Sequence, residues 1–142
     1  MFTIAEEPID IAAIRQKAGD DSVGGIAIFE GVVRNHNEGH GVQSLEYQAY
    51  SEMAEREGQV IMQETLEKFD IVTAFCQHRI GHLKIREMAV YIYVGSKHRR
   101  EAFEACQYII NEVKKRVPIW KKEHYLKKPA EWVACHGCSH PH

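Results

Sequence analysis

The sequence predicts an α+β protein with a largely antiparallel sheet in ferredoxin-like βαββαβ order, backed by helices, plus a small extra β segment. Segments rich in β-branched and aromatic residues occur in pairs on either side of a central helical segment. Helical periodicity returns later in the chain, before a proline that separates it from two final short strands. A length of 142 residues with 44% hydrophobic residues suits a single domain, residues 1–142.

The first half of the chain is expected to begin with a short helix and two extended segments. Residues 9–18 have apolar side chains at helical spacing around Asp10, a residue type that caps helices. Glycine and β-branched residues at 23–33 predict a buried strand, and the alternation at 42–50 predicts a second strand. The polar, glycine-rich loop 35–41 between them predicts that the two strands pair as a hairpin.

A central amphipathic helix is predicted at residues 51–69, weakened by Gly58. Its expected apolar face consists of Met53, Val60, Ile61, Leu66 and Phe69. Two strands are predicted after this helix, at residues 71–79 and 88–94, and Gly81 suggests a turn between them.

The strongest helical periodicity follows Ser96, which is the expected cap of a third helix. The predicted buried stripe of this helix consists of Phe103, Cys106, Ile110, Val113 and Val117. We therefore expect Cys106 in the core and not as a nucleophile. Beyond Pro118, two short strands are predicted at residues 119–126 and 132–135.

Charge is unevenly distributed, although the net charge is only -2. Residues 1–71 carry 5 Lys/Arg and 14 Asp/Glu, a net charge of -9, whereas residues 72–142 carry 13 and 6, a net charge of +7. The second half is therefore expected to hold a site for an anionic ligand. Because the chain shows neither a signal-peptide pattern nor a run of about 18 apolar residues, we expect a cytoplasmic protein with no membrane partner and no structural disulfide.

The densest positive charge lies between Lys114 and Glu123. Pro118 lacks an amide hydrogen and disfavours helical geometry in the preceding residue, so the third helix should end in a corner there. The corner places Lys114 near the helix end and Lys121 just beyond the turn, where two amines could converge on one anionic ligand. A basic run at a helix C-terminus also fits a solvated face that the helix dipole favours. Ordinary surface charge is expected for Lys115, Arg116, Lys127 and Lys128.

Four separate stretches together match one family pattern. They are Gly31–Arg34; Leu45–Tyr50; His78–Gly81 with Ser96–Arg99; and Lys114–Glu123 followed by Trp132–Val133. With these stretches in this order, the sequence resembles the large subunit of molybdopterin synthase, the MoaE family, over nearly its whole length. The resemblance implies a sulfurtransferase of molybdenum cofactor biosynthesis that converts cyclic pyranopterin monophosphate (precursor Z) into molybdopterin.

The same resemblance implies a partner and a set of site residues. The two sulfurs would arrive as a thiocarboxylate on the C-terminal tail of a small ubiquitin-like (MoaD-like) subunit. Two large subunits would form the centre of a heterotetramer. Lys114 and Lys121 would take the places of the catalytic lysines, and no cofactor or metal is implied. The implied substrate contacts are Val32, Val33, Arg34, His98, Arg99, Lys114, Lys121, Lys122 and Glu123.

Helix geometry adds a prediction about how such a site is assembled. His98 begins the third helix and Lys114 lies near its end, so at about 1.5 Å per residue the two are roughly 24 Å apart. That distance is about twice the length of a pterin monophosphate. If His98 and Arg99 contact the same substrate as Lys114, they must come from a second copy of the chain in a twofold dimer.

Some features leave other interpretations open. Cys135, Cys138, His140 and His142 could together bind a metal, although a chain end with no core behind it favours a flexible tail at 135–142. The two cysteines could instead carry sulfur as a dithiol.

Two further alternatives concern histidines and basic residues. His36 and His40 have no cysteine or carboxylate set at ligand spacing, so we expect no metal there. A nucleic-acid-binding module using Lys114–Lys128, with Trp120 and Tyr125 as stacking surfaces, is the alternative function. The overall acidic balance argues against it, and we expect no nucleic-acid partner.

Overall fold

The computed structural model describes residues 1–37, 39–126 and 129–134, and the predicted α+β class is confirmed. In chain order the elements are β1 (Phe2–Ala5), α1 (Ile11–Ala18), β2 (Gly25–Val32), β3 (His36–Asn37), β4 (His40–Ala49), α2 (Ser51–Lys68), β5 (Thr73–Arg79), β6 (Gly81–Lys84), β7 (Met88–Ser96), α3 (Arg99–Arg116), β8 (Ile119–Tyr125) and β9 (Glu131–Ala134). None of the helices within these residues is long and apolar enough to span a membrane.

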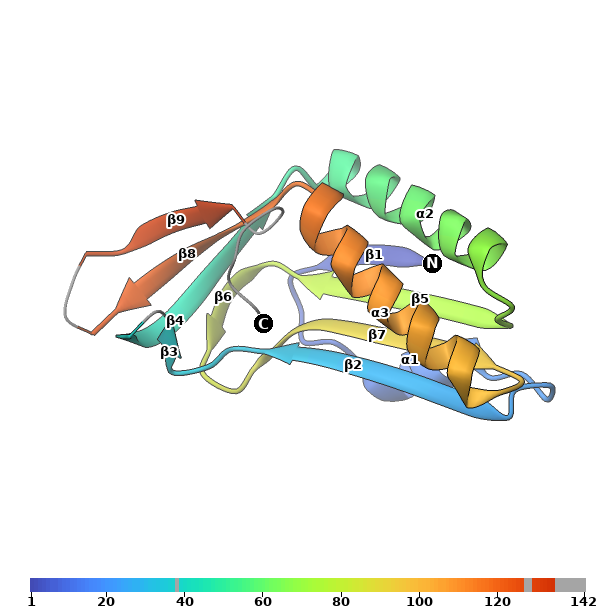
Figure 1. Ribbon diagram of the computed structural model, residues 1–142. Helices are drawn as coiled ribbons and strands as arrows, with labels where there is room; N and C mark the ends of the chain where they lie inside the picture. The colour runs from blue at the N-terminus through green and yellow to red at the C-terminus, as the bar shows by residue number, and fades with distance from the viewer. Residues whose placement is uncertain (38, 127–128, 135–142) are drawn as a thin grey trace.

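A four-stranded sheet, in the order β1-β5-β7-β2, forms the larger half of the molecule. Its strands are antiparallel except for β1, which pairs with β5 in parallel. α2 and α3 cover one face of this sheet and α1 lies against the other (Figure 1). Both faces are therefore apolar: Cys76 and Ile92 belong to the main core, while Phe75 and Tyr93 pack with Ile14 of α1.

A second, five-stranded sheet lies at one end of the first (Figure 1). It has the order β3-β4-β8-β9, and β6 also pairs with β4. The predicted hairpin between residues 23–33 and 42–50 is wrong, because β2 pairs with β7 while β4 pairs with β3, β6 and β8. The register of β2 shifts between Gly31 and Val32, and Val33 then bonds to the backbone of Glu87 and Arg86. The chain thus leaves the first sheet before β4 begins.

β6 was not expected, and it adds a strand to the second sheet. It begins at Gly81, whose φ of 98° is open to glycine but strained for other residues, so the predicted turn is present. β6 then pairs with β4. The extra β part of the fold is consequently larger than the sequence indicated.

The buried face of α2 is only partly the predicted one. Ile61 is buried and Phe69 packs against the core, whereas Met53, Val60 and Leu66 are exposed. The buried residues are Ala54, Gly58, Ile61, Met62 and Thr65. A methyl group at Gly58 would overlap the ring of Phe2, so this glycine is where β1 packs closely onto the helix. β1 has only four residues, which the sequence pattern does not predict, and its packing on α2 helps to decide which side chains of the helix are buried.

The buried face of α3 is partly as predicted. Cys106 and Val113 are buried, and the pKa of the Cys106 thiol is raised by burial to about 11, as suits a core residue. Phe103, however, is 64% exposed and does not belong to the core. The N-cap is His98, not Ser96, whose hydroxyl donates a hydrogen bond to the carbonyl of His98.

Candidate active site

The corner at Pro118 has the predicted form. α3 ends at Arg116, and the backbone of Val117 is extended, with φ -80° and ψ 127°. The amide of Val117 still bonds to the carbonyl of Val113 at 3.1 Å, and β8 begins directly after the proline. Lys114 therefore lies in the last turn of α3 and Lys121 is the third residue of β8.

Alternation along β8 places a lysine and a glutamate in the protein interior. Side chains at odd positions of this strand face the core, so Ile119, Lys121 and Glu123 are all buried. Lys121 is 5% exposed and Glu123 is 0% exposed, and Lys121 Nζ lies 3.5 Å from Glu123 Oε1. Because lysine and glutamate are rarely buried unless paired, this ion pair is a candidate functional feature.

Tyr47 lies beside this ion pair and contacts His78. Tyr47 of β4 is opposite Lys121 in the strand register and is 1% exposed. Its ring meets the ring of His78 edge-on, with centroids 5.0 Å apart. Sequence reasoning did not assign either residue to the site, although both fall in stretches that carry the family resemblance.

His78 is a buried, neutral imidazole. Burial lowers its pKa to about 4, and the charge of Lys114 contributes in the same direction. Nδ1 of His78 lies 2.8 Å from the carbonyl oxygen of Arg79. Because a carbonyl only accepts, Nδ1 carries the hydrogen and Nε2 keeps its lone pair.

Lys114 and His78 line the same small cavity. The other lining residues are Val90, Ile110, Val113, Val117 and Ile119. Lys114 is half-buried, so its ammonium is near both the apolar interior and the surface. The cavity thus combines one cation with one neutral hydrogen-bond acceptor in an otherwise apolar wall.

An ion-pair network holds the last turn of α3 against α2. Arg116 bonds to Glu64 through Nη1 and Nη2 at 2.7 and 2.9 Å, and to Glu57 through Nε at 2.8 Å. Hydrogen bonds from Arg116 and then Tyr108 lower the pKa of Glu64 to about 2. The expectation that Arg116 is ordinary surface charge is therefore wrong, because it anchors the turn that carries Lys114.

The other predicted substrate-binding residues do not all lie at the Pro118 corner. Arg34 is exposed just after β2, where Val32 is exposed and Val33 is buried. Lys122 lies on the opposite face of β8 from Lys121, with Nζ 5.5 Å from the centre of the Trp132 ring.

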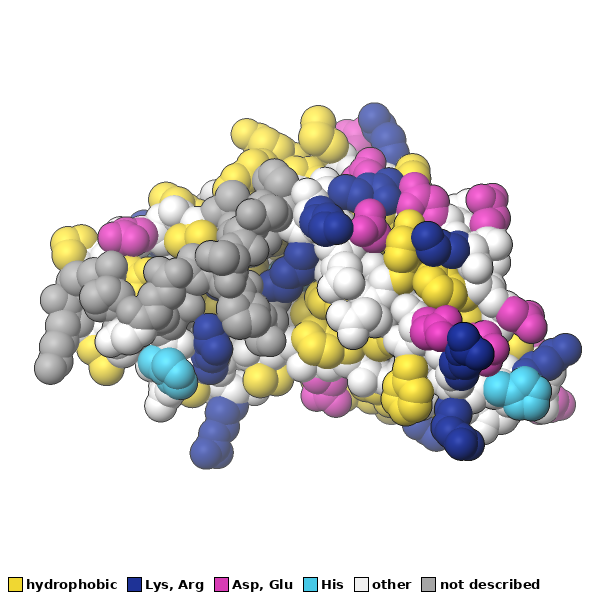
Figure 2. Space-filling model, viewed as in Figure 1, with side chains coloured by type: hydrophobic (Ala, Val, Ile, Leu, Met, Phe, Trp, Pro, Cys, Tyr) yellow, Lys and Arg dark blue, Asp and Glu magenta, His cyan; other side chains and the backbone are white. Residues whose placement is uncertain are grey.

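His98 and Arg99 are also separated from the lysines. Both are exposed at the start of α3, and Lys114 is in its last turn. Figure 2 shows basic side chains and a histidine at the end of the molecule where α3 begins. The structure thus places Lys114 just before the Pro118 corner and Lys121 and Glu123 just after it, and leaves His98 and Arg99 at the other end of α3.

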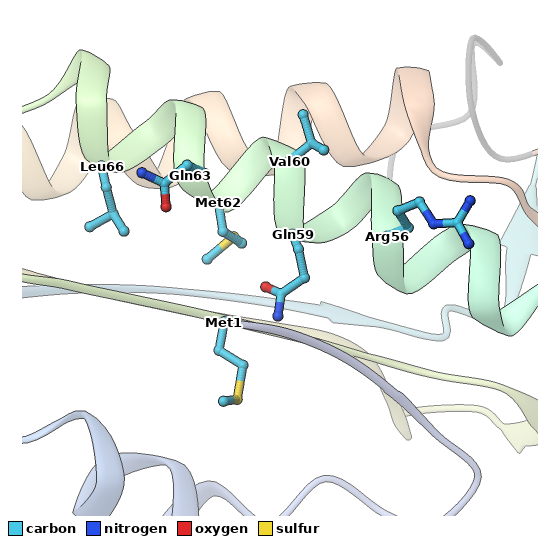
Figure 3. Close-up of a pocket in the computed structure, with 7 residues that line it drawn as sticks. All are labelled: Met1, Arg56, Gln59, Val60, Met62, Gln63 and Leu66. Carbon is cyan, nitrogen blue, oxygen red and sulfur yellow. The ribbon is translucent and has the colours of Figure 1, made fainter.

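Another pocket, between α2 and the start of β1, lacks such chemistry. In Figure 3 the side chains of Gln59 and Met62 point from α2 toward Met1. Gln59 Oε1 accepts a hydrogen bond from the amide of Phe2 at 2.8 Å, which fixes β1. Arg56 is the ionisable side chain among the described residues that line this pocket.

The fold and the lysine corner define an α+β protein with a cationic interior site, as expected of an enzyme that stabilises negative charge on its substrate. The MoaE protein family model matches residues 4–116. This chain therefore belongs to the MoaE family.

Individual relatives and solved structures agree with this assignment. A molybdopterin synthase catalytic subunit of Pyrococcus abyssi is 54% identical over 102 residues, covering 72% of this chain and 69% of that protein. The Nostoc sp. catalytic subunit is 38% identical over 138 residues, covering 96% and 84%. The structure of molybdopterin synthase from Staphylococcus aureus matches with a TM-score of 0.87 and 38% identity, covering 93% and 96% of the two chains.

A more distant structure shows the same fold. It is a protein–protein complex of subunits 1 and 2 of molybdopterin-converting factor from Helicobacter pylori, with a TM-score of 0.75 and 21% identity. The match covers 99% of this chain and 93% of that chain.

Proposed function

We propose that this chain is the catalytic subunit of a molybdopterin synthase and that Lys114 and Lys121 carry its chemistry. It converts precursor Z into molybdopterin with two sulfurs from the thiocarboxylated C-terminus of a small ubiquitin-like subunit. Membership of the MoaE family supports the reaction. The observation that carries the residue assignment is the buried Lys121–Glu123 pair of β8, the strand that follows the corner where the half-buried Lys114 lies in the last turn of α3.

The roles of the two lysines follow from where negative charge develops. Attack on the thiocarboxylate and opening of the cyclic phosphate both place negative charge on oxygen. Glu123 holds Lys121 in one position, so the ammonium need not reorganise as charge develops. Lys114 is the more exposed of the two, which suits it to meet the incoming tail.

His78 keeps the cavity near Lys114 from becoming too positive. As a neutral imidazole above pH 4 it adds no charge, and Nε2 is available to accept a hydrogen bond. In this proposal it is a positioning residue, because it lines the same cavity as Lys114.

The proposal includes two kinds of partner. A small subunit supplies the tail, and the Helicobacter pylori structure that shares this fold is a complex of two subunits of molybdopterin-converting factor. A second copy of this chain supplies His98 and Arg99 within a heterotetramer, because Lys114 follows His98 by about 16 residues, or roughly 24 Å, along α3 of one chain.

Lysine replacement tests the residue assignment. Lys114→Ala and Lys121→Ala should each lower the rate of dithiolene formation from precursor Z and thiocarboxylated partner by at least about 100-fold. Lys115→Ala and Lys84→Ala are matched controls, one beside Lys114 in the last turn of α3 and one an exposed lysine at the end of β6, and should stay within about twofold of wild type. Equal losses of activity in all four variants would mean that the rate depends on the net positive charge and not on these two lysines. Full activity of Lys114→Ala would refute the role of Lys114.

Complementation tests the shared site. A His98→Ala/Arg99→Ala chain and a Lys114→Ala chain are each expected to be inactive. After subunit exchange, each mixed dimer should regain one intact site and about half the activity of a wild-type dimer. A mixture that stays inactive would show that one chain builds the site alone.

The alternative functions make opposite predictions. A dithiol sulfur carrier requires Cys135 and Cys138, which lie outside the described residues, so changing both to serine should abolish turnover only in that case. A nucleic-acid module requires accessible cations. Lys121 is buried and Arg116 is bound to glutamates, so we expect no oligonucleotide binding at low salt.

A further inference from the structure

Three potential metal ligands come together on the second sheet, away from the lysine corner. Glu46, His82 and His124 belong to the neighbouring strands β4, β6 and β8. Glu46 lies opposite His82, and His124 lies opposite Ser44, two residues before Glu46. Since alternate residues share a face, these three side chains lie on the face opposite Lys121 and Glu123.

The spacing of their ligand atoms is close to that of a metal site. One ligand atom from each residue lies within 4.8 Å of the others. His124 Nε2 is 3.7 Å from Glu46 Oε1, and the two imidazole rings have centroids 5.4 Å apart. Ligand atoms around a tetrahedral zinc ion lie about 3.4 Å apart, so side-chain rotations that move these atoms by about 1 Å complete the geometry.

A second observation points to a missing ligand. Nε2 of His124 is buried and has no hydrogen-bond partner among the described residues, and 3.7 Å to Glu46 is too long for a hydrogen bond. Buried polar atoms are nearly always satisfied. Lys122 lies opposite Glu46 in the strand register and has its ammonium 5.5 Å from the centre of the Trp132 ring.

We propose that Glu46, His82 and His124 bind one divalent transition-metal ion of the zinc class. Two imidazoles and one carboxylate are ligands that Zn²⁺ and Co²⁺ accept, and three protein ligands leave a position for water. The ion joins β6, β4 and β8, and so stiffens the strand that carries Lys121 and Glu123 on its other face. This site is independent of the proposed reaction and differs from the expectation of no metal.

Metal titration of the metal-stripped 142-residue chain tests this site. Co²⁺ and Zn²⁺ should bind at one ion per chain, measured by calorimetry and by visible absorption of Co²⁺. The C-terminal cysteines and histidines could bind a second ion, so the key measurement uses a tail variant. This variant carries the substitutions Cys135→Ser, Cys138→Ser, His136→Ala, His140→Ala and His142→Ala.

The tail variant should keep one ion with nitrogen and oxygen ligands and no thiolate-to-cobalt absorption. In that background, His82→Ala, His124→Ala and Glu46→Gln should each weaken binding at least about 100-fold, since even outer-shell partners contribute about 10–100-fold. His36→Ala is the matched control, an exposed histidine on β3 that should bind as the background does.

Thermal unfolding supplies a readout that does not depend on activity. Free Zn²⁺ at about 100 times its Kd should raise the Tm of the tail variant by about 10 °C, and this rise should vanish in Glu46→Gln. Circular dichroism confirms that each variant is folded. Loss of all binding in the tail variant, or unchanged affinity in both His82→Ala and His124→Ala, would overturn the proposed site.

Discussion

Replacing Glu123 by glutamine removes a charge from the interior while keeping the shape of the side chain. Glu123 is 0% exposed, and the ammonium of Lys121, which is 5% exposed, lies 3.5 Å away. The variant leaves that ammonium in the interior without this carboxylate. Breaking a buried ion pair from one side typically costs about 3–5 kcal/mol, so Glu123→Gln should lower the free energy of unfolding by that amount.

A double-mutant cycle separates the ion pair from other effects of the substitution. Lys121→Met removes the ammonium and keeps the length of the side chain. The double variant Lys121→Met/Glu123→Gln should be at least about 1.5 kcal/mol more stable than the sum of the single losses predicts, because neither charge is left alone. Urea unfolding followed by circular dichroism, at one protein concentration and with unchanged m values, provides the free energies.

Two results would contradict this reasoning. A loss below about 1 kcal/mol in Glu123→Gln would mean that water reaches the Lys121 ammonium. Single-variant losses that add within about 0.5 kcal/mol would mean that the two charges do not interact.

Three further predictions concern His78, Gly58 and Arg116. Between pH 6.5 and 4 the unfolded chain binds a proton that folded His78 does not, so stability should fall by about 3 kcal/mol as pH drops from 7 to 4; His78→Gln should remove that slope, and parallel curves would disprove the assignment. Gly58→Ala should lose about 1–3 kcal/mol through overlap with the Phe2 ring, although alanine favours helices, and Phe2→Leu should restore part of it; a more stable Gly58→Ala would contradict the packing. Arg116→Ala should lose about 1–2 kcal/mol of unfolding free energy and become less sensitive to salt, because its partners are about one-third exposed; Lys115→Ala should lose under about 0.5 kcal/mol, and equal losses would argue against the network.

The sequence alone determined most helices and strands, because their signals act over a few residues. Asp10 accepts a hydrogen bond from the amide of Ala13 at 3.1 Å, as a cap should. Pro118 ends α3 through its own ring. Lys114 and Lys121 flank that proline, so their common corner was predictable without any knowledge of distant contacts.

Tertiary structure decided which apolar side chains are buried. Phe103 follows helical spacing but is 64% exposed. Gly58 lowers the helix propensity of α2, yet it is the position where the ring of Phe2 packs against the helix. Periodicity shows that a face is apolar. Which face is buried depends on the element that packs there, and β1 comes from the far end of the chain.

Local sequence patterns also do not predict which strands pair with each other. β2 and β4 look like a hairpin, yet they belong to different sheets, because the edge of a strand bonds to any strand placed beside it. Lys121 and Lys122 are neighbours in sequence and face opposite sides of β8.

Strand register likewise assembled the cluster of Glu46, His82 and His124 from three separate strands. A shift of one residue in that register would have turned each strand's side chains to the other face, and no pattern within a single strand reveals which register its neighbours impose.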